Sequence, residues 1–427
     1  MKTLNIGLFG FGCVGQGLYD VFTHSLHSVG KIRRICVKHR EKPRSIPMEF
    51  FTFEKNNILE DPEIDTVVEL IDDAEEAYRI VKQAIQNKKN VVTANKKMLA
   101  WYLSELQQEA VKNGVSLLYE ASACGSIPII RLLEEYYDNE PLQYIGGIFN
   151  GTTNYILTRT VEAGLSYEEA LKEAREKGFA ESNPESDVEA WDPVYKCVIL
   201  AFHALGIHLD FRSIPRLGIT TLLQKDTAKA AALKKRIRLV AYAGLSENGK
   251  YTAMVLPAWV DSSSPLYDTQ YEYNGVVTEG RFTSRQFLKG KGAGGHPTGS
   301  AVLSDISALK YGYRYEYKKF IKETKPEPDN DKLFRVYIRL NREDTFLRKF
   351  IFRWEEITCD REHISGIGWI SYARLCELVP VLRKENGFLA LVGEPWNQTV
   401  WNEAETFDIY GIDNNGIPEE SEPTYSK

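Results

Sequence analysis

Short apolar segments recur through the first 120 residues, and each has the length of a buried strand. They are residues 4–9, 32–37, 66–71, 90–93 and 115–119. Longer segments of mixed apolar and polar residues, about 75–87 and 97–113, lie between the later ones and are typical of helices. Strands that alternate with helices predict an α/β fold of the Rossmann type, in which helices cover both faces of a doubly wound parallel sheet.

The pattern changes after residue 142 and predicts a second domain of the α+β class. Its expected strands are 144–149, 251–257 and 271–278. Its expected helices are about 193–205 and 223–243. This combination predicts a mixed sheet covered by helices. Because sheet faces of this kind often pair subunits, we expect a homodimer or a larger assembly.

A further segment begins near residue 320, where the run Lys325-Pro-Glu-Pro-Asp-Asn reads as a linker. Beyond it we expect strands at 333–340 and 388–392, a helix at 372–383 and a frayed acidic tail at 416–427. These elements predict a small α+β extension at the C-terminal end of the chain.

The chain therefore divides into three parts. A dinucleotide-binding domain occupies 1–137 and is completed by 286–319, and a substrate-binding and dimerisation domain occupies 138–285. The extension occupies 320–427, and it is a candidate for a regulatory role because the motifs described below all precede it.

A glycine-rich turn follows the first strand directly. Its key positions are Gly10, Gly12, Cys13, Val14 and Gly15. A glycine at the second position lets the backbone approach a pyrophosphate, and the helix that opens there presents free N–H groups to it. The placement after a strand and before a helix predicts a dinucleotide site, although a tight glycine turn without a ligand is the alternative.

The end of the second strand bears on the choice of cofactor. Enzymes that prefer NAD usually carry a carboxylate there, which binds the ribose 2′-hydroxyl. Here the strand is followed by Lys38, His39 and Arg40, and the guanidinium of Arg40 matches a 2′-phosphate in charge and geometry. We therefore expect NADP to serve at least as well as NAD. Solvated loop charges are the alternative, and Glu41 would reach the ribose if the strand ran longer.

Polar side chains follow several of the predicted strands. Asp72, Asn95, Lys96 and Glu120 all fall where a strand ends. Because ligands of doubly wound sheets bind at the carboxyl ends of the strands, these residues predict a site along that edge.

One stretch in the second domain combines acids with an amine. Glu181, Asp187 and Asp192 lie close in sequence to Lys196, and the last two are four residues apart on one predicted helix. Lys196 opens an apolar run, where an unpaired ammonium would be costly. A lysine held by carboxylates beside an apolar wall can give or take a proton. The alternative is that Asp192 caps the helix and Lys196 extends toward solvent.

Composition narrows the class of protein. The chain holds 53 basic and 59 acidic residues, for a net charge of −6, which argues against a nucleic-acid partner. The six cysteines show no paired or metal-binding spacing, which is typical of free thiols in a reducing compartment. The apolar runs are too short to span a bilayer, and the chain enters a strand almost at once, without a signal peptide. We expect a cytoplasmic protein without a membrane partner.

Several motifs together resemble one enzyme family. The stretch around Lys196 is similar to the signature of homoserine dehydrogenase at Ala174, Gly178, Phe179, Ala180, Pro184, Asp187, Asp192 and Lys196. The runs Thr93-Ala-Asn-Lys96, Glu120-Ala-Ser-Ala-Cys-Gly-Ser-Ile-Pro128 and Asn150-Gly-Thr-Thr-Asn154 also resemble that family. So does the glycine-rich segment that contains Gly294. The sequence also departs from the family pattern, because Ala190 and Ser126 stand where glycine is usual and Asp72-Asp73 stands where Gly-Gly is more common.

The resemblance implies an activity. It is the NAD(P)-dependent interconversion of L-homoserine and L-aspartate 4-semialdehyde, in the biosynthesis of threonine and methionine. The small-molecule substrate would be bound by Gly178, Glu181, Asp187, Asp192 and Lys196. Lys196 would carry the proton, Asp192 would orient Lys196, and Lys96 would stabilise the developing alkoxide.

The resemblance also implies contacts to a cofactor and to a metal ion. Gly294 and Lys96 would contact the dinucleotide. A structural Na⁺ would be held by the Glu120 carboxylate and by backbone carbonyls, at Glu120, Ala123, Gly125 and Ile127. Two rival functions remain open at this point. One is a dinucleotide-sensing regulator without turnover, and the other is a related oxidoreductase that acts on another amino-acid semialdehyde.

Overall fold

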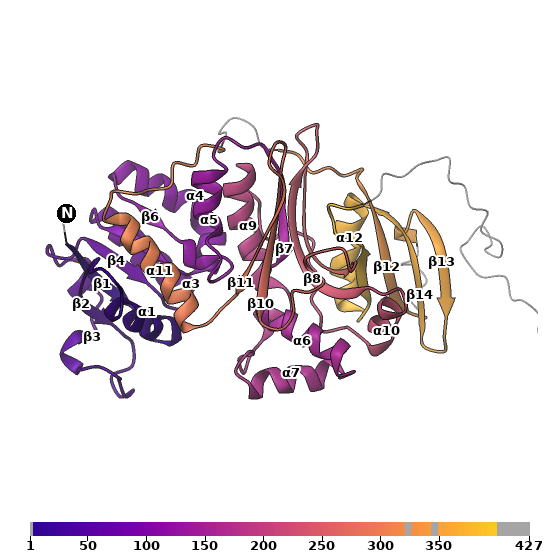
Figure 1. Cartoon of the computed structure of the whole chain (residues 1–427), viewed down its shortest axis with the longest axis horizontal. Coiled ribbons are helices and arrows are strands. Elements are labelled where there is room, and N and C mark those ends of the chain that lie inside the picture. The colour runs from indigo at the N-terminus through magenta and orange to yellow at the C-terminus, as the bar shows by residue number, and fades with distance from the viewer. Residues whose placement is uncertain (1–2, 321–325, 343–348, 399–427) are drawn as a thin grey trace, which may run out of the picture.

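The computed structural model describes residues 3–320, 326–342 and 349–398. The chain forms two sheets that lie side by side along the long axis of the molecule (Figure 1). The predicted acidic tail at 416–427 lies outside the described residues.

The first sheet is parallel throughout and has the strand order β3-β2-β1-β4-β5-β6. Its strands are β1 (Leu4–Phe9), β2 (Gly30–Cys36), β3 (Phe51–Thr52), β4 (Thr66–Glu69), β5 (Asn90–Thr93) and β6 (Leu117–Leu118). The helices of this region are α1 (Cys13–Thr23), α2 (Asn56–Leu59), α3 (Ala74–Gln86) and α4 (Lys96–Asn113). This order reverses direction at β1, so the predicted Rossmann-type sheet is confirmed, and its ligand edge lies beyond the carboxyl ends of β1 and β4.

Helix α11 (Gly295–Leu309) returns from the second region and packs along α1. Figure 1 shows it in orange among the indigo N-terminal elements. Glycines allow this close approach, since a Cβ atom on Gly17 would lie 2.2 Å from the carbonyl carbon of Gly295. The segment 286–319 was expected to complete the first domain. Its first residues belong instead to β11 in the second sheet, and α11 is the part that packs on the first domain.

The second sheet has nine strands in the order β11-β10-β7-β8-β9-β15-β12-β14-β13. Its strands are β7 (Leu142–Ile148), β8 (Arg236–Leu245), β9 (Tyr251–Val260), β10 (Tyr273–Gly280), β11 (Ser284–Lys291), β12 (Leu333–Asn341), β13 (Arg353–Cys359), β14 (His363–Ser371) and β15 (Phe388–Val392). The associated helices are α5 (Ile129–Arg131), α6 (Gly151–Glu162), α7 (Tyr167–Glu176), α8 (Glu185–Val188), α9 (Trp191–Leu205), α10 (Gln224–Ala232) and α12 (Tyr372–Lys384).

Side chains of β8 alternate between two apolar cores. Ile237 and Leu239 face the core that contains α6 and α9, whereas Val240 and Tyr242 face the core that contains α12. This two-sided burial explains why the predicted helix at 223–243 is wrong beyond residue 232. A strand buried on both faces is a continuous apolar run, which periodicity cannot distinguish from a buried helix. The predicted list also lacked β14, and it lacked β11 and β13, whose charged residues mask the alternation of a strand.

The C-terminal extension continues the second sheet. Strand β15 pairs in parallel with β9, and β12 then pairs with β15 and β14. The predicted linker forms two hydrogen bonds with Tyr251, the first residue of β9. The N–H of Tyr251 donates to the Glu327 carbonyl at 2.8 Å, and the Tyr251 carbonyl accepts from the N–H of Asp329 at 2.7 Å. In the described residues the extension therefore belongs to the same folded body as the rest of the second sheet.

A buried ion pair joins the extension to α10. The Nε atom of Arg339 on β12 lies 3.0 and 3.1 Å from the two carboxylate oxygens of Asp226, and both side chains are at most 1% exposed. The hydroxyl of Tyr337 donates to the same carboxylate at 2.9 Å. The guanidinium also donates to the carbonyl of Thr221 at 2.6 Å, so its charge and several of its donors are satisfied inside the core.

Substitution of Arg339 by Met should destabilise the protein because it leaves the Asp226 carboxylate buried without a counter-charge. We expect the free energy of unfolding, measured by urea denaturation, to fall by about 3–5 kcal/mol. Arg335 lies on the same face of β12 and pairs with Glu355 at 2.9 Å, but its side chain is 37% exposed. The Arg335→Met control should therefore cost less than about 1 kcal/mol. Equal losses in the two variants would contradict this account.

Candidate active site

A carboxylate lies between two lysines where the two sheets meet. The Nζ atom of Lys196 on α9 donates to Asp192 Oδ2 at 2.7 Å and to the carbonyl of Phe149 at 2.7 Å. The Nζ atom of Lys96, at the start of α4, lies 2.9 Å from Asp192 Oδ1. The side chain of Lys96 is 40% exposed, whereas those of Lys196 and Asp192 are 8% and 3% exposed. The cluster is therefore buried at Lys196 and Asp192 and open at Lys96, which comes from a helix of the first sheet.

Local structure at two helix ends produces this arrangement. Asn95 accepts a hydrogen bond from the N–H of Met98 at 2.9 Å and so caps α4, which fixes Lys96 at the carboxyl edge of β5. Ala190 precedes α9 in the left-handed conformation, with φ +64°. A residue other than glycine costs roughly 1–2 kcal/mol of conformational energy in this region. This cost accounts for the glycine that is usual here in the family that the sequence resembles. Here the methyl group is tolerated and is fully buried.

Asn150 is a site residue that sequence reasoning missed. Its Nδ2 atom donates to Asp187 Oδ1 at 2.6 Å and to Asp192 Oδ2 at 2.8 Å. Its Oδ1 atom accepts from the N–H of Thr153 at 2.8 Å and caps α6. The Asn-Gly-Thr-Thr-Asn turn was the available signal, but a helix cap alone explains an asparagine there. One amide group thus holds two carboxylates that would otherwise repel each other.

The electrostatic environment separates the two aspartates. Burial disfavours the charge on Asp192, but the ammonium groups of Lys196 and Lys96 outweigh it and hold the pKa of Asp192 well below its usual range. Burial, followed by the charge of Asp192, raises the pKa of Asp187. The charge of Asp192 also raises the pKa of Lys96 against the effect of burial. These pKa directions favour the ionised form of Asp192 and make Asp187 the more easily protonated of the two acids.

Glu181 and Gly178 lie on the loop between α7 and α8. Gly178 has φ +77°, a conformation that favours glycine, and the following carbonyl of Phe179 accepts a hydrogen bond from the hydroxyl of Thr152 at 2.7 Å. The Glu181 side chain is exposed and stands outside the hydrogen-bonded cluster. Its charge nevertheless contributes, after that of Asp192, to the raised pKa of Lys96.

The glycine-rich turn has the shape of a pyrophosphate cradle. Gly12 begins α1 without a side-chain cap, and a Cβ atom added to it would meet nothing within 4 Å. Gly10 has φ +92°, and a Cβ atom on Gly15 would lie 2.5 Å from the Gly10 carbonyl oxygen. Cys13 is exposed and Val14 is half-buried at the same helix end. The free N–H groups there suit an anionic ligand.

Two other predicted cofactor contacts lie around this turn. Gly294 has φ +121° and precedes α11 directly. Gly295, the first residue of α11, packs against Cys13. Arg40 is exposed beyond the end of β2, and its guanidinium carbon lies 4.4 Å from the centre of the Phe53 ring. A stacked guanidinium is held in place while its N–H groups stay free to bind an anion.

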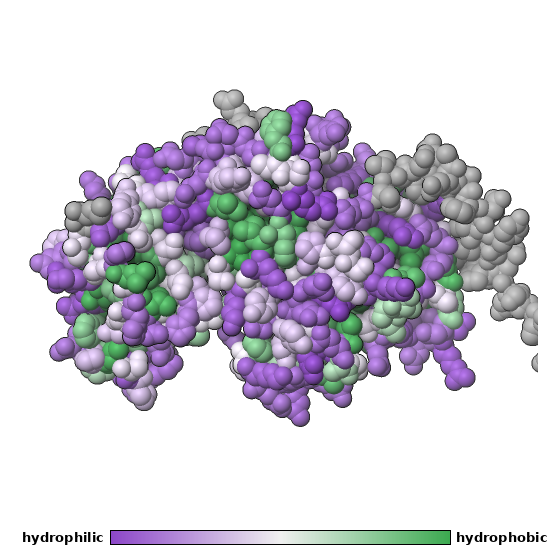
Figure 2. Space-filling model, in the orientation of Figure 1, coloured by the Kyte–Doolittle hydropathy of each residue, from purple (hydrophilic) through white to green (hydrophobic). Residues whose placement is uncertain are grey.

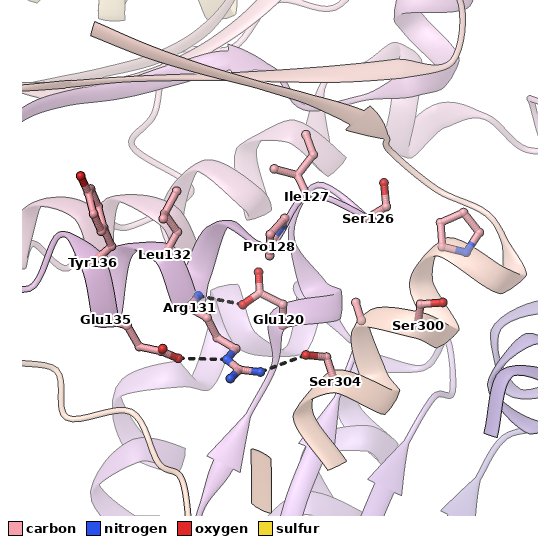
Figure 3. A pocket seen from close by; sticks show the side chains of 13 residues that line it. Glu120, Ser126, Ile127, Pro128, Arg131, Leu132, Glu135, Tyr136, Ser300 and Ser304 are labelled. Carbon is pink, nitrogen blue, oxygen red and sulfur yellow. Dashed lines mark hydrogen bonds and ion pairs between the residues drawn. The ribbon is translucent and has the colours of Figure 1, made fainter. Parts of the chain in front are cut away.

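The loop after β6 carries the residues predicted to hold a cation. The Glu120 carboxylate accepts the N–H groups of Ile130 at 2.9 Å and Arg131 at 2.8 Å, as Figure 3 shows for Arg131. Burial raises the pKa of Glu120 to about 7. Cys124 and Gly125 have positive φ angles but Ser126 does not, so serine fits where the family usually has glycine.

A cavity of about 400 Å³ opens beside this loop. Glu120, Gly125, Ile127 and Arg131 line it together with residues of α11 (Figure 3). Within the part of the chain that the structure describes, no group of three or more His, Cys, Asp or Glu side chains could hold a metal ion. A cation in this region would therefore depend on backbone carbonyls and one carboxylate.

Comparisons with known proteins agree with this site. Residues 10–120 match the family described as homoserine dehydrogenase, NAD binding domain, and residues 128–307 match the family described as homoserine dehydrogenase. Homoserine dehydrogenase of Bacillus subtilis is 36% identical over 323 residues, which cover 74% of each chain. That of Synechocystis is 36% identical over 314 residues, covering 71% of this chain and 72% of its own.

Solved structures give the same result. The homoserine dehydrogenase from Thiobacillus denitrificans superposes with a TM-score of 0.80 at 28% identity, over 92% of this chain and 99% of its own. A hyperthermophilic archaeal homoserine dehydrogenase in complex with NADPH superposes with a TM-score of 0.64 at 26% identity, over 74% of this chain and 99% of its own. From its sequence and its fold together, the chain belongs to the homoserine dehydrogenase family.

Proposed function

We propose that the cluster of Lys196, Asp192 and Lys96 carries out the reaction of this family, in which L-homoserine and L-aspartate 4-semialdehyde are interconverted. The observation that supports it most directly is the bonding of Lys196. An ammonium group has three donors, and two of them are used by Asp192 and Phe149. The third remains for a substrate oxygen, which needs a proton when the aldehyde is reduced.

Each neighbouring residue has a distinct task in this proposal. When bound, the nicotinamide cofactor supplies or accepts the hydride. Lys196 gives its proton to the carbonyl oxygen during reduction and takes it from the hydroxyl during oxidation. Asp192 orients Lys196 through their 2.7 Å bond, and Lys96 adds positive potential where the alkoxide develops. Asp187 and Glu181 bind the substrate ammonium, and Gly178 leaves space for the substrate beside them.

The rival functions are less well supported. A dinucleotide-sensing regulator without turnover would not need a lysine paired at 2.7 Å in a buried site, where the charges are costly to keep. An oxidoreductase for another amino-acid semialdehyde would use the same groups. Family membership favours homoserine over the other substrate.

We further propose that NADP is used at least as well as NAD. The end of β2 lacks the carboxylate that binds a ribose 2′-hydroxyl, and Arg40 stands there with its guanidinium stacked on Phe53. The pyrophosphate would lie against the N–H groups of Cys13 and Val14. The archaeal relative described in complex with NADPH supports a phosphorylated cofactor.

A structural Na⁺ also belongs to the proposal, and the residues present fit it. Glu120 and the carbonyls of Ala123, Gly125 and Ile127 would form the oxygen-only set that hard cations take. Asp305 lies against Glu120, since its Oδ2 atom accepts the Glu120 N–H at 2.9 Å, and burial raises the pKa of Asp305. A cation would offset the negative charge that these two buried acids carry when ionised.

Assembly and location complete the proposal. We expect a homodimer or larger assembly, because β11 is an edge strand in the described sheet and an apolar patch interrupts the hydrophilic surface near it (Figure 2). All six cysteines are free, which suits a cytoplasmic enzyme of threonine and methionine biosynthesis. No helix in the described ranges has the length and apolar character needed to cross a membrane.

The Lys196→Ala variant tests the proton-transfer assignment. Turnover should fall by roughly two to four orders of magnitude in both directions, because the transition state loses its acid and base. Cofactor binding, measured by the quenching of protein fluorescence, should stay near the wild-type value. Lys235→Ala is the matched control, since Lys235 forms a 2.6 Å ion pair with Asp261 away from the cluster. Turnover in Lys196→Ala close to that of the control would remove the assignment.

The Arg40→Ala variant tests the cofactor preference. The ratio of kcat/KM for NADPH to that for NADH should fall by roughly tenfold or more, because a charge-assisted contact to the 2′-phosphate is lost. Arg33→Ala removes an equivalent exposed charge from β2 itself and should leave the ratio unchanged. A wild-type preference for NADH, or an unchanged ratio in Arg40→Ala, would refute this part of the proposal.

A further inference from the structure

Residues 216–223, which we name the bridging loop, contact the segment that carries the aspartates. The N–H of Ile219 donates to the Val188 carbonyl at 2.9 Å, and the hydroxyl of Thr220 donates to the Glu189 carboxylate at 2.7 Å. The approach is close, since a Cβ atom on Gly218 would lie 1.9 Å from the Val188 carbonyl oxygen. The bridging loop therefore contacts the backbone between Asp187 and Asp192.

Arg216, the first residue of the bridging loop, also contacts the segment that carries the aspartates. Its guanidinium carbon lies 3.4 Å from the ring centre of Trp191, the first residue of α9, and its Nη1 atom donates to the Glu189 carbonyl. A guanidinium is attracted to the face of an indole ring, and the attraction is stronger where water is partly excluded. Because Trp191 precedes Asp192, this contact fixes the direction in which α9 begins.

The far end of the bridging loop is bonded to the C-terminal extension. The hydroxyl of Thr221 donates at 2.8 Å to the carbonyl of Gly387, which lies just before β15. The carbonyl of Thr221 accepts from Arg339 Nη2 on β12 at 2.6 Å. Thr220 thus contacts the segment 187–192, which carries the two aspartates and which we name the acid-bearing segment. Its neighbour Thr221 contacts the extension.

The acid-bearing segment depends on such contacts for its position. Helix α8 has four residues, and Ala190 follows it in a strained conformation with φ +64°. A single helical turn has little stability of its own. Asn150 holds the carboxylates of Asp187 and Asp192 from one side, and the bridging loop holds the backbone from the other.

We infer that Thr220 and Thr221 are positioning residues for substrate binding, through which the C-terminal extension holds Asp187 in place to receive the substrate ammonium. The inference rests on the proposed role of Asp187. In this arrangement the extension contributes to homoserine affinity from outside the site. The contacts lie in series, because the extension reaches Thr221, Thr221 adjoins Thr220, and Thr220 holds Glu189.

Valine variants of the two threonines test the inference, because they remove a hydroxyl at nearly constant volume. Thr220→Val and Thr221→Val should each raise KM for homoserine by roughly three- to tenfold, with KM for the cofactor within twofold of wild type. Contacts in series should be non-additive, so the double variant should resemble the worse single variant. Thr221→Ser, which restores the hydroxyl, should recover the wild-type KM.

Thr227→Val is the matched control, since the buried hydroxyl of Thr227 donates to the Gln224 carbonyl within its own helix α10. Its KM for homoserine should stay at the wild-type value, and melting temperatures of all variants should be compared. Valine variants that melt lower but keep the wild-type KM would overturn the inference, as would a double variant whose effect is the product of the single effects.

A separate variant distinguishes failure of the inference from failure of the proposed function. Asp187→Asn removes the charge that would receive the substrate ammonium. If it leaves KM for homoserine unchanged, the proposed role of Asp187 fails, and the inference fails with it. If it raises KM while Thr220→Val and Thr221→Val do not, the proposed role stands and the inference alone is overturned.

Discussion

The structure depends on one buried carboxylate, that of Asp192, which lies within 2.9 Å of two ammonium groups. Removing the Asp192 carboxylate would leave the two ammonium groups facing each other without a counter-charge, and Lys196 is almost fully buried. The two lysines come from different parts of the chain. Lys96 begins a helix of the dinucleotide sheet, and Lys196 lies in a helix that packs on the nine-stranded sheet. The ion pairs therefore fix how the two sheets meet at the site.

This constraint also explains the backbone around the cluster. The Phe149 carbonyl accepts from Lys196 at 2.7 Å and from Asn274 at 3.1 Å, so the residue that follows β7 is bonded to the cluster. Asn150 is the next residue, and its side-chain amide donates hydrogen bonds to both Asp187 and Asp192. The aspartates differ because one is held ionised by both lysines, whereas the other is raised in pKa by burial and by its neighbour. One acid thus fixes the lysines, and the other is the acid that we propose binds the substrate ammonium.

Much of this arrangement was predictable from the sequence. The strands at 90–93 and 388–392 agree with the structure at both ends, because short apolar runs bounded by polar residues leave little ambiguity. The spacing of Asp192 and Lys196 predicted their contact, since residues four apart share one face of a helix. The bond between Lys96 and Asp192 was not predictable from spacing, because it depends on how two sheets pack together.

Other features required the three-dimensional structure for similar reasons. Strand β8 was mistaken for a helix because both of its faces are buried. The run that starts at Lys325 reads as a linker in the sequence, but beyond it β15 pairs with β9 and Arg339 forms an ion pair with Asp226. Long-range pairing of this kind leaves no local pattern in the sequence. The role of Asn150 was hidden because its cap of α6 is a sufficient local explanation for an asparagine.

The central claim is that Asp192 and the lysines act as one unit across the two sheets. A double-mutant cycle on kcat/KM for homoserine, with Asp192→Asn, Lys96→Met and the double variant, tests it most directly. Groups that act together are strongly non-additive. The account predicts that the double variant is within about threefold of the worse single variant, because either change already disrupts the pair. Losses that multiply in the double variant would show that Lys96 and Asp192 act independently, and would contradict the account.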